Sequence, residues 1–74
     1  MNLFVQKDHL STMDGLTVDI IDEYIDDAVG QVRFEKGVGR HVKLYGRYEG
    51  TVQSHEECVA FVKGVQVVLE HMIG

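Results

Sequence analysis

A chain of 74 residues is long enough for one small domain, and such a chain buries only about 60% of the surface that its unfolded form exposes. Hydrophobic residues make up 45% of the sequence and charged residues 26%, which argues against wholesale disorder. The single cysteine, Cys58, excludes an internal disulfide framework, and the net charge of -5 argues against a typical nucleic-acid binder.

The same features favour a soluble, cytoplasmic protein. One cysteine fits a reducing compartment. The first residues, MNLFVQKDHL, lack the basic region and apolar run of a signal peptide. No stretch approaches the ~20 apolar residues that a membrane-spanning helix needs.

Charge is segregated along the chain. Residues 8–30 contain seven carboxylates and no Lys or Arg, which gives a net charge of -7. Residues 31–49 contain five Lys or Arg against two Glu, which gives +3. Such asymmetry informs the choice of binding partner more than the fold.

The first elements are short. Residues 2–7 form an apolar run that is compatible with a strand, and residues 8–13 read as a connection. Ser11 and Asp14 have the spacing of a helix capping box, with Asp in place of the usual Glu or Gln.

The pattern of residues 14–29 predicts a helix with an acidic side. On a 3.6-residue period the apolar and acidic side chains separate, and Gly30 follows as a stop signal. A strand over residues 16–20 is the alternative, because these residues alternate in polarity, but Ile21 and Asp22 interrupt that alternation. The apolar set is Leu16, Ile20, Ile21, Tyr24, Ile25 and Ala28, and the acidic set is Asp19, Asp22, Glu23 and Asp26.

Residues 31–49 predict an antiparallel hairpin with one buried face. Polarity alternates on both sides of the sequence KGVGR, residues 36–40, whose two glycines suit a hairpin loop. Gly46 interrupts the second strand and is read as a bulge. The inward set is Val32, Phe34, Val42, Leu44 and Tyr48.

A second helix is predicted from a cap at Ser54 to about Met72. Ser54 and Glu57 have capping-box spacing, and an apolar face follows at helical intervals. The predicted fold is therefore a single small α+β domain over residues 1–74. Two helices pack on a two- or three-stranded antiparallel sheet in the order β-α-β-β-α.

The acidic side of the predicted first helix is the leading candidate for a binding site. Like charges one helical turn apart repel each other, and a basic partner would relieve that repulsion. A solvated face screened by water and salt is the alternative. The candidate partner-binding residues are Asp19, Asp22, Glu23, Asp26 and Asp27.

The basic face of the predicted hairpin is a second candidate. Strand-borne aromatic and basic side chains can stack on bases and hold phosphates. An ordinary solvated sheet face, whose charges guard an edge strand, explains the same residues. The candidate nucleic-acid face comprises Arg33, Lys43, Tyr45 and Arg47.

No pattern in the sequence predicts catalysis, a metal site or a cofactor. His55 and Cys58 lie on the predicted last helix, but a zinc site needs three or four converging ligands, and Cys58 falls on the apolar side. Gly37 and Gly39 lack the third glycine and the strand-to-helix context of a dinucleotide site. We therefore expect a protein that is not an enzyme.

The last helix also has a second apolar side, formed by Ala60, Gly64 and Val67. Small residues let another backbone approach closely, which favours a homodimer seam. Coverage by the predicted first helix, or simple exposure to water, are the alternatives.

In size, acidity and lack of a catalytic pattern, the chain is similar to small phage-encoded inhibitors of host nucleic-acid enzymes, a resemblance of composition that covers no motif. Together these features predict a non-enzymatic module that acts stoichiometrically, as an inhibitor or adaptor, on a larger protein with a basic surface. A regulator that binds nucleic acid through the basic hairpin face is the alternative.

Overall fold

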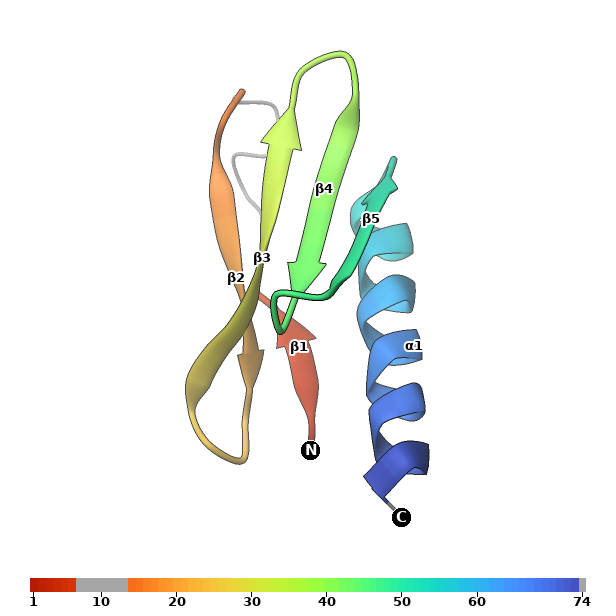
Figure 1. The fold of residues 1–74 in the computed structure, drawn as a ribbon. Coiled ribbons are helices and arrows are strands. Elements are labelled where there is room, and N and C mark those ends of the chain that lie inside the picture. The colour runs from red at the N-terminus through yellow and green to blue at the C-terminus, as the bar shows by residue number, and fades with distance from the viewer. Residues whose placement is uncertain (7–13, 74) are drawn as a thin grey trace.

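The computed structural model describes residues 1–6 and 14–73, and within them it has five strands followed by one helix (Figure 1). The strands pair antiparallel in chain order, from β1 to β5. Figure 1 shows the sheet curling, so that α1 lies between the two edge strands, β1 and β5. The elements are β1 (Leu3–Val5), β2 (Thr17–Asp22), β3 (Asp27–Glu35), β4 (Gly39–Leu44), β5 (Tyr48–Val52) and α1 (His55–Ile73).

The helix predicted over residues 14–29 is wrong, and with it the two-helix fold. These residues form β2, a turn and the first part of β3, and Asp22 pairs with Asp27 across the turn. The β-branched residues of this stretch have low helix propensity, and its like charges at helical spacing are unfavourable. Strand pairing buries Ile20 completely and leaves the tip of the hairpin in solvent.

A β-bulge interrupts the pairing of β2 with β3. Ile20 pairs with Gly30, whereas the next residue, Ile21, pairs with Ala28, so β3 carries one extra residue. A bulge of this kind bends a strand and changes where its side chains point. The interruption at Ile21 and Asp22 has a different cause: β2 keeps alternating, and Asp22 takes a buried inward position where its carboxylate accepts a backbone hydrogen bond.

The core lies between the concave side of the sheet and α1. Its buried residues alternate along the strands and recur at helical spacing along α1. Gly50 allows close packing there, because a Cβ at this position would lie 2.7 Å from the Phe61 ring. The fully or nearly fully buried apolar residues are Leu3, Ile20, Val32, Val42, Leu44, Cys58, Val62 and Val65.

Side chains of α1 also close the edge of the sheet at β1. The amide of Leu3 donates to Gln66 Oε1 at 2.8 Å, and Lys63 Nζ donates to the Leu3 carbonyl at 2.7 Å. An unpaired strand edge is a template for aggregation, and covering it with a helix is one of the ways that proteins avoid this. The helix therefore stabilises the fold through polar contacts as well as apolar ones.

The remaining predictions for the chain have mixed outcomes. The C-terminal helix is confirmed with its cap, since the Glu57 amide donates to Ser54 Oγ at 3.1 Å. The hairpin is confirmed for β3 and β4, but residues 45–47 form a turn rather than a bulged strand, and Tyr48 begins a fifth strand. The cap predicted at Ser11 lies outside the described residues. In the part of the chain that is described, no helix is long and apolar enough to cross a membrane.

Candidate functional site

The turn between β2 and β3 presents two apolar side chains to solvent. Tyr24 is 75% exposed and Ile25 is 62% exposed, and they are neighbours in the chain. Carboxylates at Glu23, Asp26 and Asp27 surround them, and all three of these residues are exposed. We call residues 23–27 the hairpin tip.

The base of this hairpin is held by hydrogen bonds. The Asp22 side chain is only 6% exposed, and its Oδ1 accepts from the Tyr24 amide at 3.0 Å and from the Asn2 amide at 3.4 Å. The Asn2 side-chain amide donates to Glu23 Oε2, and Asp27 Oδ1 accepts from the Ala28 amide at 2.9 Å. The exposed side chains of the tip therefore project from an anchored support.

The structure brings together three of the five acids that were predicted to bind a partner. Glu23, Asp26 and Asp27 share the hairpin tip. Asp22 lies inside the hairpin base, where its carboxylate accepts backbone hydrogen bonds rather than facing solvent. Asp19 lies further along β2, on the convex side of the sheet.

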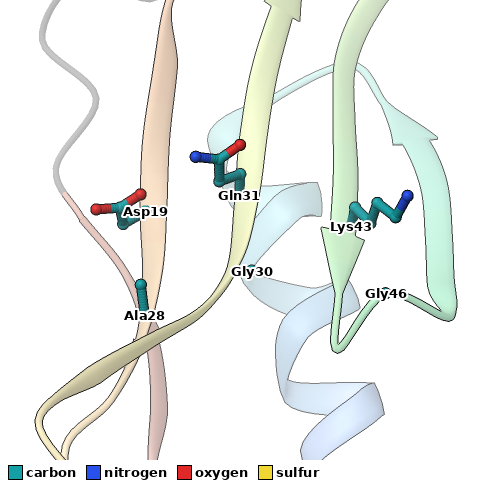
Figure 2. Close-up of a pocket in the computed structure, with 6 residues that line it drawn as sticks. All are labelled: Asp19, Ala28, Gly30, Gln31, Lys43 and Gly46. Atoms are coloured by element: carbon teal, nitrogen blue, oxygen red, sulfur yellow. The ribbon is translucent and has the colours of Figure 1, made fainter.

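The convex side of the sheet carries a shallow recess of about 310 Å³ (Figure 2). Asp19, Gln31 and Lys43 form a cross-strand row along it. Gly30 lies at this recess, and a Cβ there would be 2.3 Å from the Lys43 carbonyl oxygen. Figure 2 shows Lys43 extending towards β5, away from Asp19, and its Nζ lies 3.7 Å from Glu49 Oε1.

The four residues of the predicted nucleic-acid face do not form one basic surface. Arg33 and Lys43 are exposed on strands, whereas Tyr45 and Arg47 lie in the turn between β4 and β5. Carboxylates interrupt the basic groups, because Glu49 pairs with both Lys43 and His41, at 3.7 and 3.4 Å. The Arg47 guanidinium stacks over the Tyr48 ring, 5.2 Å from its centre.

Tyr45 has an unusual backbone conformation. Its φ of 53° lies in the left-handed region, which is uncommon for a bulky side chain. Burial and then the charge of Asp22 raise the pKa of the Tyr45 hydroxyl above its usual value of 10.0. The Asp22 carboxylate at the hairpin base therefore acts on the Tyr45 hydroxyl in this second turn.

The proposed seam on the last helix stays uncovered by the described residues. Ala60 and Gly64 are exposed, and Val67 is 66% exposed. Because the first helix does not exist, it cannot provide the cover that was considered as an alternative to a second copy.

Tyr24 and Ile25 were not predicted as site residues. The helical interpretation placed them on a buried side, whereas they occupy a four-residue turn. One signal was present in the sequence, because aspartate is common in turns. Aspartate also tolerates the left-handed conformation that Asp26 adopts, with φ of 51°.

Searches of protein-family models, curated proteins and solved structures find no match to this chain. Among the described residues, no group of three or more His, Cys, Asp or Glu side chains is placed to hold a metal ion.

Proposed function

We propose that this protein is a non-enzymatic binding module that acts stoichiometrically on a larger protein through the hairpin tip. The observation that carries the proposal is the exposure of Tyr24 and Ile25, at 75% and 62%, on a turn whose base is anchored. The hairpin takes the place of the predicted acidic helix as the proposed binding element. The acids that lie at its tip are Glu23, Asp26 and Asp27.

Stability gives no reason for apolar side chains at this turn. Turns between strands favour Gly, Asn, Asp and Ser, which suit the backbone and interact well with water. A tyrosine that enters a pocket on a partner is a frequent source of binding energy at protein interfaces. Tyr24 and Ile25 therefore support a contact with an apolar recess on another protein.

The carboxylates around the tip indicate the charge of that partner. Three exposed acids beside Tyr24 and Ile25 form a negatively charged rim. Complementary charge at the rim of an interface speeds association and selects the partner. The partner that fits is a larger protein whose apolar recess is bordered by Lys and Arg, such as a surface that otherwise holds nucleic acid.

The test removes the two apolar side chains and leaves the charges. We expect a Tyr24→Ser, Ile25→Ser double variant to keep its circular dichroism spectrum and to lose a protein that the parent captures from lysate. Val38→Ser is the matched control, because Val38 is also exposed, at 51%, on another hairpin turn. Equal capture by all three proteins, at equal stoichiometry, would contradict the proposal.

A second set of variants tests the charged rim with the captured protein. Glu23→Gln, Asp26→Asn and Asp27→Asn together retain size and hydrogen-bonding oxygens while removing three charges. Screening weakens charge attraction beyond ~10 Å at 0.1 M salt, so we expect slower association and a flatter salt dependence than for the parent. An unchanged association rate at low salt would exclude the basic partner.

Binding of nucleic acid through Arg33, Lys43, Tyr45 and Arg47 is the competing proposal. The contacts of Glu49 with Lys43 and His41 weigh against it, since they place a carboxylate within that face. Titration with single- and double-stranded DNA and RNA at low salt separates the two. Saturable binding that disappears when Arg33, Lys43 and Arg47 become Ala would favour the nucleic-acid function.

A further inference from the structure

The outward side of α1 carries apolar residues where a surface helix is usually polar. Val67 is 66% exposed and Val68 48%, and a Cβ at Gly64 would meet nothing within 4 Å. Beside these residues an open groove of about 550 Å³ runs between α1 and β5, and its walls include Tyr48 and Phe61. The second apolar side of the helix is therefore continuous with an apolar groove.

The order of residues on this side is nearly symmetric about Gly64. Three and four positions before it stand Phe61 and Ala60, and three and four positions after it stand Val67 and Val68. Seven positions away on either side are Glu57 and His71, whose side chains can form a carboxylate–imidazole pair. With about 3.6 residues per turn, all of these positions lie within roughly 60° of Gly64 around the helix. We call the seven residues 57, 60, 61, 64, 67, 68 and 71 the helix seam.

We infer that the helix seam is where a second copy of this chain binds, with the two α1 helices antiparallel and a two-fold axis at Gly64. This arrangement places Ala60 beside Val67 of the second copy, and Phe61 beside its Val68. It also places Glu57 opposite His71 of the second copy, twice by symmetry. Gly64 meets its own counterpart, so the backbones can approach closely.

Hydrogen-bonding complementarity between carboxylate and imidazole favours the antiparallel orientation. Parallel helices would bring Glu57 against Glu57 and His71 against His71, whereas antiparallel helices pair unlike groups. The antiparallel pair also sets the positive end of each helix dipole beside the negative end of the other. The seam from Glu57 to His71 is about 21 Å long at 1.5 Å per residue.

The same axis brings the two grooves together. A two-fold axis that passes between the two helices, perpendicular to the plane that contains them, keeps the β5 side of one copy on the same side as the β5 of the other. Arg47, which directly precedes β5, and Glu49 of β5 border the groove and then extend the contact beyond the helices. This enlargement matters because a stable interface needs about 800 Å² from each partner.

Cysteine cross-linking tests both the contact and its register. A Gly64→Cys variant should form an intermolecular disulfide rapidly on mild oxidation, because the axis brings the two positions together. Thr17→Cys is the matched control, since Thr17 is exposed on β2, which does not border the groove, and the native Cys58 is buried. Equal rates of disulfide formation in the two variants would overturn the inference.

Light scattering on the full chain gives an independent measurement. We expect the parent to be a dimer at high micromolar concentration and Gly64→Gln to be a monomer with its helical circular dichroism retained. His71→Glu should weaken the dimer at least about tenfold, because it creates two like-charge contacts, whereas His71→Lys should not. A monomeric parent would overturn the inference, and neither result depends on the hairpin tip, which is tested by variants of its own.

Discussion

Ile20 and Ile25 are the same residue type, five positions apart, and they have opposite environments. Ile20 is fully buried in the core at the base of the β2–β3 hairpin, whereas Ile25 is 62% exposed at its tip. A helical pattern places both on one broad apolar side. Packing therefore accounts for the residue type at the hairpin base but not for the apolar residues of the tip.

The largest expected effect is a difference in stability between variants of these two isoleucines. Ile20→Ala should lower the free energy of unfolding by about 2–5 kcal/mol, because it leaves a cavity in a small core. Ile25→Ala should change it by less than about 0.5 kcal/mol, since exposed side chains contribute little. Urea denaturation followed by circular dichroism measures both. Similar losses for the two variants would mean that Ile25 is packed in solution.

A smaller effect is expected at the polar contact that holds the hairpin base. Asp22→Ala removes the acceptor for the amides of Tyr24 and Asn2, and we expect a loss of about 1–3 kcal/mol. Asp22→Asn keeps a carbonyl oxygen at the same place and serves as the control. If the Asn variant is destabilised as much as the Ala variant, the negative charge rather than the hydrogen-bond acceptor stabilises the base.

The C-terminal helix and the β2–β3 hairpin differ in how far the sequence predicts them. The C-terminal helix was predictable because the Ser54 cap and the apolar spacing are local and agree with each other. The segment from residue 14 to 29 was not, because the polar Asp22 takes a buried inward position of β2 and the apolar Ile21 an outward one, which hides the alternation that identifies a strand. A five-residue alternation was visible at residues 16–20. The strand that pairs with this segment would identify it as a strand, but that pairing cannot be read from the segment itself.

The candidate site follows the same division. Composition alone identified the acidic segment, and Glu23, Asp26 and Asp27 do lie together. The sequence could not separate Asp22 from them, because its burial results from pairing with Leu3 across β1 and β2. The sequence also did not predict that Tyr24 is exposed, because its position depends on the four-residue length of the turn.

Two turns at this end of the molecule provide the smallest and most specific comparison. Asp26 and Tyr45 are the non-glycine residues with positive φ in the described part of the chain, at 51° and 53°. Aspartate adopts this conformation readily, because its short polar side chain bonds to nearby backbone, whereas a bulky side chain crowds the carbonyl group. Tyr45 is therefore strained in a way that Asp26 is not.

Replacing each residue by asparagine measures that strain. Tyr45→Asn should raise the free energy of unfolding by about 0.5–1 kcal/mol, because asparagine relieves the left-handed conformation at a side chain that is already 40% exposed. Asp26→Asn should change it by less than about 0.5 kcal/mol, since both residues tolerate the conformation. Urea denaturation of the two variants beside the parent gives both values. A loss of stability in Tyr45→Asn would mean that the packing of the Tyr45 ring near Asp22 outweighs its backbone strain, and the ring would then belong to the support of the hairpin base.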